Sequence, residues 1–383
     1  MSDLAVLMGG PSPEHDVSIL TGLQAARELA RDGRRGVRAI YWTKTGDWFE
    51  VDAGLEAEAF LDGVPRGATP LRLALGPDGG FVPEGGRFGR PRPLSLAAAV
   101  VCCHGGPGED GTLQAALDLA GIPYTGPTVA GAALGMDKLA FAGVIHAAGL
   151  PLLPRALLHH GTEKLDFAGP YIVKPRFGGS SIGIEVASDF ATARARLDGN
   201  PHLRLGAVVE PYRADLFDLQ LGVRRWPEPE ASAVERPLRS GEAPGGASAA
   251  GSTGATAEIL GYSDKYVGGE GMAGAPRELP ARVPDALAEE LRSAAVEVAQ
   301  RCLVRGLARV DFLSDGQSLW VNEINTIPGS LGRYLWIDPP LTFGQLLEDM
   351  LAEAAARPSR AYSAAGADGS VLRSASSIAA KLA

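Results

Sequence analysis

The sequence predicts an α/β protein built from two or three lobes. Its 383 residues, 45% of them hydrophobic, are too many for one ordinary core and suit several packed lobes. Apolar runs alternate with helical stretches over the first third of the chain, a pattern typical of a parallel sheet covered by helices. Two of these runs end in glycine loops, at the edge where open α/β sheets bind their ligands.

The first predicted domain spans residues 1–134. Leu4 to Met8 is an apolar strand that runs into a glycine pair, and Ala97 to Cys103 is a second strand that ends at a His-Gly-Gly loop. Thr112 to Ala120 follows as a helix, which the next residue, Gly121, brings to an end. We therefore expect a parallel-sheet domain here.

A smaller lobe is predicted over residues 135–213. It contains a helix that ends near Gly149, a strand from Tyr171 to Lys174, a loop of glycines and serines, and a strand from Ala207 to Tyr212. A third lobe, residues 214–356, follows it. Its expected elements are a helix from Asp285 to Leu303 and two strands, Leu307 to Leu313 and Ser318 to Ile324, joined by an Asp-Gly turn.

Two segments have a composition that disfavours a packed core. Residues 226–257 are rich in Gly, Ala, Ser, Pro and Glu, and residues 357–383 are small and polar with few large apolar side chains. We expect the first to be a flexible insert of the third lobe and the second to be a disordered tail.

Charge and cysteine usage exclude several classes of partner. The net charge of −9 and the pI near 5.3 argue against nucleic acid and anionic membranes as partners. No stretch reaches the ~18 apolar residues of a membrane span, and no basic leader precedes the first strand. Three cysteines without a zinc-like spacing fit a reduced, cytoplasmic protein whose metals would be held by oxygen ligands.

The strongest local motif is Lys174 followed by the glycine-serine loop from Gly178 to Gly183. Backbone N–H groups and the hydroxyls of Ser180 and Ser181 suit phosphate oxygens, with Lys174 as a point charge on a nucleotide. The alternative is a flexible surface turn. The spacing matches neither a Walker A loop nor a dinucleotide fingerprint.

A second motif places carboxylates on two neighbouring strands. Alternation puts Arg309 and Asp311 on one face of their strand, and Glu323 and Asn325 on one face of the next. Two carboxylates and an amide oxygen are suitable ligands for Mg²⁺ bridging to nucleotide phosphates. The alternative is a solvated strand face with cross-strand charge pairs.

Two glycine loops carry the remaining candidates. Glu14 follows the first loop and could hold a substrate ammonium, although acidic residues also favour a helix N-terminus for its dipole alone. His104, at the end of the second strand, is either a satisfied core histidine or the wall of a pocket.

Together, these segments resemble the D-alanine:D-alanine ligase family of the ATP-grasp superfamily, from about Leu4 to Leu351. The fold that this implies is a Rossmann-like N-terminal domain followed by two α+β lobes that clamp ATP. The matching stretches occur in family order: Met8 to Ser18, His104 to Gly111, Ile122 to Gly126, Met136 to Lys138, Ile172 to Gly183, Asp264 to Tyr266, Arg309 to Phe312 and Asn322 to Gly329.

The resemblance implies an ATP-dependent carbon–nitrogen ligase that joins two small amino acids, D-alanine first, through an acyl phosphate, as in peptidoglycan biosynthesis. Two Mg²⁺ ions, for which Mn²⁺ is a substitute, would bind Asp311, Glu323 and Asn325. Arg309 and the Gly329 amide would receive the oxyanion, and Glu14, Ser180 and Tyr266 would orient the first substrate. The implied ATP-binding residues are Lys138, Lys174, Ser181, Glu210, Lys265 and, for the ribose, Asp218 or Asp215. Family members are commonly homodimers, so the resemblance also implies a possible homodimer.

The largest departure from the family follows Gly329. Tyr334 stands where a serine normally receives the carboxylate of the second substrate, Arg333 adds a charge beside it, and Leu335 comes next. We expect these residues, with His104, to line the substrate site and to shift the second substrate away from D-alanine. The competing hypotheses are a biosynthetic amide ligase of specialised metabolism with another carboxylate or amine, and a nucleotide-sensing or structural protein without turnover.

Overall fold

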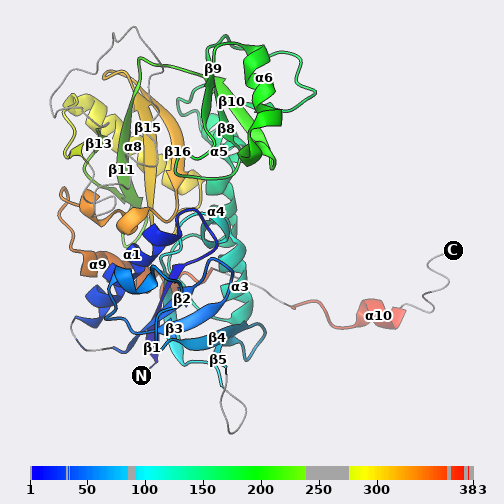
Figure 1. Cartoon of the computed structure of the whole chain (residues 1–383), viewed down its shortest axis with the longest axis vertical. Helices are drawn as coiled ribbons and strands as arrows, with labels where there is room; N and C mark the ends of the chain where they lie inside the picture. Colours follow the sequence, from blue (N-terminus) through cyan, green and yellow to red (C-terminus); the bar gives the residue numbers. More distant parts are fainter. Residues whose placement is uncertain are drawn as a thin grey trace.

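The computed structural model describes residues 2–31, 33, 35–84, 92–238, 276–359, 364–374 and 378. Figure 1 shows an N-terminal sheet domain at the bottom and two lobes above it, with helices α4 (Val129–Met136) and α5 (Lys138–Ala147) between them. Within the described ranges, no helix is long and apolar enough to cross a membrane.

The N-terminal sheet is mixed, with strand order β5-β4-β3-β2-β1-β6. Strand β1 pairs in parallel with β2 and β6, as the sequence predicted. The other half of the sheet, from β2 to β5, is antiparallel, because a tight turn after Trp42 returns the chain beside β2. The strands are β1 (Asp3–Gly9), β2 (Val37–Trp42), β3 (Trp48–Val51), β4 (Thr69–Ala74), β5 (Gly80–Pro83) and β6 (Leu96–Val101).

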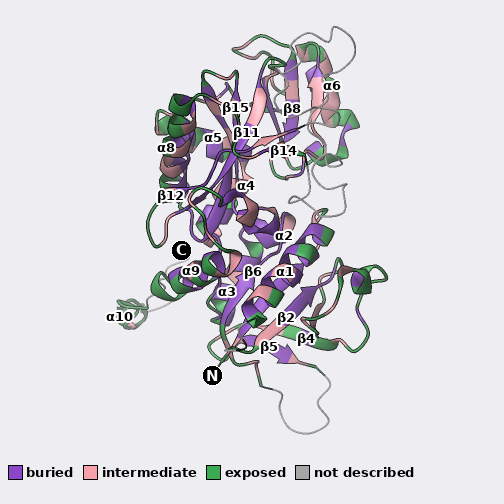
Figure 2. Ribbon diagram, turned by 90° about the vertical axis from the view of Figure 1, so that its left-hand side faces the viewer, coloured by how far each residue is buried: buried purple, intermediate pink, exposed green. Residues whose placement is uncertain are grey.

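Three helices from distant parts of the sequence pack on or beside this sheet. Helix α1 (His15–Ala30) buries its apolar face against β1, and α9 (Phe343–Ala356) returns from the end of the third lobe to the same core. Figure 2 shows the buried side of α1 turned toward the sheet. Helix α3 (Thr112–Ala120) has the predicted bounds and ends at Gly121, whose φ of 72° is the left-handed conformation that glycine adopts without strain.

The central lobe is a four-stranded antiparallel sheet of order β7-β10-β8-β9. Its strands are β7 (Ala156–Leu158), β8 (Tyr171–Pro175), β9 (Glu185–Ala187) and β10 (Ala207–Pro211), and it is covered by α6 (Phe190–Gly199). The predicted strands coincide with β8 and β10, and the glycine-serine loop leaves the end of β8.

The third lobe has a second four-stranded antiparallel sheet, of order β12-β11-β15-β16. Its strands are β11 (Phe217–Arg224), β12 (Glu230–Ala231), β15 (Leu307–Ser314) and β16 (Leu319–Asn325). Helix α8 (Asp285–Arg301) packs on one face through Leu287, Leu291 and Val298. The other face carries the polar residues of the motifs and looks toward the central lobe (Figure 1).

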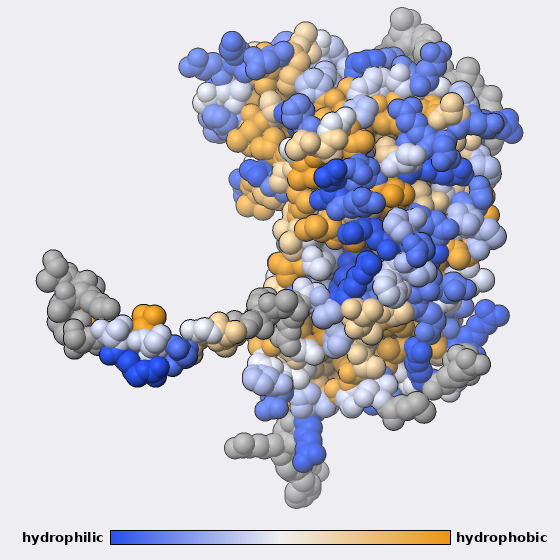
Figure 3. All heavy atoms as spheres, turned by 180° about the vertical axis from the view of Figure 1, so that it is seen from behind, coloured by the Kyte–Doolittle hydropathy of each residue, from blue (hydrophilic) through white to orange (hydrophobic). Residues whose placement is uncertain are grey.

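The proposed insert is packed in its described part. Within residues 226–238, Ala233 and Val234 are buried, and β13 (Arg236–Pro237) pairs with β14 (Arg277–Glu278) beside β11. Val234 belongs to the core under α8. The flexibility expected of the segment stays a prediction, and residues 239–257 lie outside the described part. In the tail, α10 (Ser370–Ser374) stands away from the body with no buried residue (Figures 1 and 3).

Candidate active site

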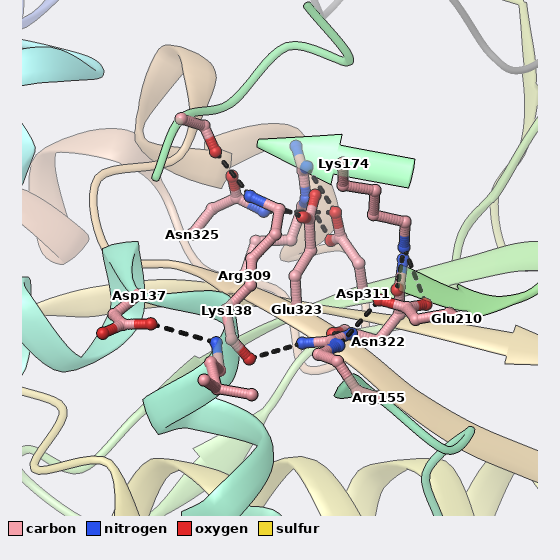
Figure 4. A network of polar contacts seen from close by, with 12 residues as sticks. Asp137, Lys138, Arg155, Lys174, Glu210, Arg309, Asp311, Asn322, Glu323 and Asn325 are labelled. Carbon is pink, nitrogen blue, oxygen red and sulfur yellow. Dashed lines mark hydrogen bonds and ion pairs between the residues drawn. The ribbon is translucent and has the colours of Figure 1, made fainter. Parts of the chain in front are cut away.

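A buried ion-pair network lies where the central lobe faces the third lobe. Lys174 on β8 and Glu210 on β10 stand on one face of their sheet, and the Lys174 Nζ is 2.9 Å from a Glu210 carboxylate oxygen. Arg155 reaches the other oxygen at 2.7 Å. Burial alone would raise the pKa of Glu210, but the two cations outweigh it and lower that pKa. The carboxylate therefore holds Lys174 at the wall of the cleft (Figure 4).

Lys138 joins this wall from the first turn of α5. Asp137 caps the helix by accepting from the N–H groups of Leu139 and Ala140, and it also pairs with Arg176, with a shortest N–O distance of 2.5 Å. The Lys138 Nζ donates to the Gly178 carbonyl at 2.6 Å and lies 3.8 Å from Glu323. Burial lowers the pKa of Lys138. The ammonium groups of Lys138 and Lys174 are thus both directed toward the acidic strands.

The acidic motif assembles on paired strands β15 and β16. In their register Arg309 stands opposite Asn325, and Asp311 stands opposite Glu323. The Arg309 guanidinium donates to both oxygens of Asp311, at 2.6 and 2.8 Å, and Asn325 donates to one of them at 3.1 Å. Figure 4 shows these side chains converging from one face of the sheet.

These side chains fit a hard divalent cation. Two carboxylates and an amide supply the oxygen donors that Mg²⁺ prefers. Glu323 lines both the cleft that contains Lys174 and the adjoining pocket that contains Lys138. Among the described residues, no group of three or more His, Cys, Asp and Glu residues forms a metal site by itself. Such a site would therefore need Asn325 and, as nucleotide-bound Mg²⁺ commonly does, oxygens from a phosphate ligand.

A cleft extends from this acidic face between the two lobes. Apolar residues from both lobes form one end of it, including Ile172, Leu216 and Leu313, while Asp218 and Ser181 contribute polar groups. An apolar slot that ends in lysines and carboxylates suits a purine base joined to phosphates. The cleft is also lined by Lys174, Glu210, Gln220, Asp311, Asn322 and Glu323.

The glycine-serine loop reaches across to the N-terminal domain. The Ser180 hydroxyl donates to the Glu14 carboxylate at 2.5 Å. This contact joins two of the trio of residues, Glu14, Ser180 and Tyr266, that the family resemblance implies orient the first substrate. Ser180 and Ser181 both have positive φ, 53° and 58°, a conformation that non-glycine residues seldom adopt. The third member of the trio, Tyr266, lies outside the described residues, as does Lys265.

The segment from Thr326 to Ser330, which contains Gly329, is anchored by the N-terminal domain. His104 is fully engaged, with its Nδ1 donating to the Ile327 carbonyl at 2.6 Å and its Nε2 accepting from Thr21 at 2.8 Å. The Thr21 oxygen in turn accepts from the Ser330 N–H at 3.1 Å. Burial lowers the pKa of His104, which favours this neutral ring. His104 is thus a satisfied buried histidine that holds the segment.

Glu109 anchors the same segment from the other side. Its carboxylate accepts from the N–H groups of Gly105 and Ile327, at 3.0 and 2.8 Å, and from the Thr326 hydroxyl at 3.2 Å. Burial raises the pKa of Glu109 to about 7 in spite of these donors. The backbone around Gly329 is therefore fixed by a set of hydrogen bonds from residues distant in sequence.

Two family models together match most of the chain. The model described as D-ala D-ala ligase N-terminus matches residues 3–127, and the model described as D-ala D-ala ligase C-terminus matches residues 132–352. The chain belongs to the D-alanine–D-alanine ligase family.

Individual relatives cover nearly the whole chain. A D-alanine–D-alanine ligase of Mycobacterium sp. (strain KMS) is 33% identical over 92% of this chain and 96% of its own length, and one of Nocardia farcinica is 32% identical over 92% and 97%. Among solved structures, the VanG D-Ala:D-Ser ligase of Enterococcus faecalis superposes with a TM-score of 0.72 at 22% identity, over 92% of this chain and 99% of its own. The Coxiella burnetii D-alanine–D-alanine ligase gives 0.71 at 21%, over 98% and 97%, which supports the fold.

In this member of the D-alanine–D-alanine ligase family, the residues after Gly329 point in different directions. Leu335 is fully buried in the core shared with the N-terminal sheet. The Arg333 guanidinium lies over the Phe343 ring, with 5.6 Å from its Cζ to the ring centroid. Tyr334 turns instead toward Arg277, whose Cζ is 4.4 Å from its ring centroid. Of these three residues, Tyr334 is therefore the one whose ring lies against an arginine.

Several residues of this site were not predicted from the sequence. Arg155 and Asn322 complete the lysine network, and Thr21 and Glu109 hold the segment around Gly329. Glu109 and Asn322 stand in stretches that match the family, so their positions carried a signal. Arg155 and Thr21 act through contacts between distant segments that no local pattern shows.

Proposed function

We propose that this protein is an ATP-dependent ligase that activates the carboxylate of D-alanine as an acyl phosphate and joins it to the amine of a second amino acid. The observation that carries the proposal is the cleft lined by Lys174, Asp311 and Glu323. Lys138 lies beside Glu323 in the adjoining pocket, and Arg309 pairs with Asp311. We place the reaction in the cytoplasm, in keeping with three free, buried cysteines.

Each group has a task in this reaction. ATP would lie in the cleft with its base on the apolar end and its phosphates beside Lys138 and Lys174, with Asp218 toward the ribose. Asp311, Glu323 and Asn325 would hold Mg²⁺, which when bound neutralises phosphate charge during phosphoryl transfer. Glu14 and Ser180 would orient the ammonium of the first substrate and close the loop over it, which keeps water from the acyl phosphate.

The second step needs donors for a developing oxyanion. The amine of the second substrate attacks the acyl carbon, the C–O bond to phosphate breaks, and inorganic phosphate and a proton are released. Arg309 and the Gly329 N–H would receive the oxyanion, and removing one such donor typically costs about 3 kcal/mol of barrier. His104, Thr21 and Glu109 fix the segment that carries this N–H, so it needs no rearrangement when the oxyanion forms.

Phosphate release tests the proposal. Purified protein is incubated with ATP, Mg²⁺ and D-alanine, first alone and then with a panel of amino acids and simple amines, and products are identified by mass. We expect phosphate release that depends on D-alanine and a product with an amide bond. Turnover that ignores D-alanine, or survives Asp311→Asn unchanged, contradicts it.

A second candidate, an amide ligase with another acceptor, is favoured by one observation. Tyr334 occupies the position at which the sequence resemblance implies a serine for the acceptor. In the same assay, D-alanine that is activated but not accepted, together with coupling of another amine, would support this candidate.

A further inference from the structure

Tyr334 is covered by the guanidinium of Arg277, a residue distant in sequence. Arg277 begins β14, and its Cζ lies over the Tyr334 ring, 4.4 Å from the ring centroid. Its side chain is only 14% exposed. A cation stacked on an aromatic face in a partly dry site is held firmly, because the ring attracts the charge and limits its rotation. Arg277 and Tyr334 thus form one unit.

A buried carboxylate fixes the other side of this unit. Glu235, 2% exposed, lies 2.8 Å from Arg277 and accepts from the Gln220 amide at 2.6 Å. Gln220 stands directly opposite Asp311 in the pairing of β11 with β15. A continuous chain of polar contacts therefore runs from Arg277 to the strand that carries the proposed metal ligand and Arg309.

The hydroxyl of Tyr334 is buried and has no hydrogen-bond partner among the described residues. Folded proteins rarely leave a buried hydroxyl unsatisfied, so such a group at a site calls for a ligand. Burial raises the pKa of Tyr334, and Arg309 and Arg277 are among the charges that act on it. The hydroxyl is therefore a protonated donor in the neighbourhood of the residue proposed to receive the oxyanion.

We infer that Arg277 and the Tyr334 hydroxyl together bind the carboxylate of the second substrate, so that the acceptor is an α-amino acid rather than a simple amine. The inference rests on the proposed function and deepens it. A guanidinium presents a planar fork of N–H donors that matches a carboxylate, and the tyrosine adds a further donor. Arg333 was expected to supply this charge, but it stacks on Phe343, and Arg277 takes its place.

Competition between two acceptors tests the inference. D-Alanine serves as first substrate, and D-alanine and D-alaninamide compete at equal concentration as acceptors, so that the two amines differ only in the carboxylate. The ratio of the two products, measured by mass, equals the ratio of their kcat/KM values. We expect the wild type to favour the carboxylate at least tenfold, Arg277→Gln to reduce this preference to about twofold, and Tyr334→Phe to reduce it about threefold.

Two further variants separate binding from folding. Arg277→Gln leaves Glu235 buried without its cation, so the double variant Arg277→Gln/Glu235→Gln is made as well and should show the same loss of preference. Arg236→Gln is the matched control, because Arg236 lies on β13, the strand paired with β14, and is 12% exposed. Its Cζ lies 4.8 Å from the centroid of the Phe217 ring, and its loss should leave the product ratio unchanged.

Trapping the acyl phosphate with hydroxylamine distinguishes failure of the proposed function from failure of the inference about Arg277 and Tyr334. If the wild type forms no hydroxamate from D-alanine, the proposed function fails. If hydroxamate forms but the Arg277 variants keep the full preference for D-alanine over D-alaninamide, only the present inference is overturned. A wild type that couples D-alaninamide as readily as D-alanine overturns it equally.

Discussion

Replacing Glu210 by Gln should destabilise the fold far more than removing a surface carboxylate. The substitution keeps the shape of the side chain but removes a charge shared by two buried cations, Lys174 at 2.9 Å and Arg155 at 2.7 Å, whose side chains are 8% and 4% exposed. With an effective dielectric constant of about 20, each attraction at this distance is about 6 kcal/mol. Desolvation offsets much of it, and breaking a buried pair from one side typically costs about 3–5 kcal/mol.

The assay is chemical denaturation at pH 7 followed by circular dichroism. The matched control is Glu297→Gln on α8, which also removes a carboxylate paired with an arginine, here at 2.6 Å but with side chains 57% and 34% exposed. An exposed i,i+4 pair contributes only about 0.5 kcal/mol. We expect a loss of about 4 kcal/mol for Glu210→Gln; losses of equal size in both variants would refute the reasoning.

The same substitution changes the acid sensitivity. Because the folded state lowers the pKa of Glu210, its ionisation contributes stability that is present above its unfolded pKa of about 4.3 and is lost as the pH falls through the folded value. Glu210→Gln should remove this component of acid destabilisation. ATP should also restore part of the lost stability at pH 7, since phosphates placed beside Lys174 would replace the missing charge.

The remaining predictions concern the anchored segment, a glycine turn and the loop. Glu109 has a folded pKa of about 7, above its unfolded value, so the free energy of unfolding should decline by about 3 kcal/mol as the pH rises from about 4.5 to 7. Urea titrations at several pH values should show that Glu109→Gln removes this decline. Gly9→Ala places a Cβ 2.3 Å from the Trp42 carbonyl oxygen, whereas the Cβ of Gly46→Ala meets nothing within 4 Å. Because both glycines have positive φ, thermal melts should show a loss of stability of about 1 kcal/mol for Gly46→Ala and clearly more for Gly9→Ala. Ser180→Ala removes a donor to Glu14 and should reduce kcat/KM for the first substrate about tenfold, while an unchanged value would argue against that contact in turnover.

Local signals were sufficient for the elements that carry the site. Residues 112–120 form a helix because an apolar stripe ends at a glycine able to adopt positive φ, and the paired strands β15 and β16 follow from alternation and a tight turn. The alignment of Asp311 with Glu323 follows from the same pairing. These are short-range features, which a sequence pattern can express.

Contacts between distant segments could not be predicted in the same way. The position of Arg277 over Tyr334 depends on how the paired strands β13 and β14 pack beside β11. The role of His104 as an anchor depends on the approach of two domains. The charge of Arg333 suggested a substrate contact, but its direction is set by Phe343 on α9. In helices and strands the periodicity of the sequence indicates which way a side chain points, but an irregular turn has no such periodicity.

Isotope transfer from the carboxylate tests the central claim most directly. D-Alanine labelled with ¹⁸O in both carboxylate oxygens is turned over with ATP, Mg²⁺ and the best acceptor, and the released phosphate is analysed by mass. If the γ-phosphoryl group passes to the carboxylate of D-alanine, each phosphate released with product carries one ¹⁸O. Phosphate without label, released in step with product, would contradict an acyl phosphate and with it the assignment of this cleft.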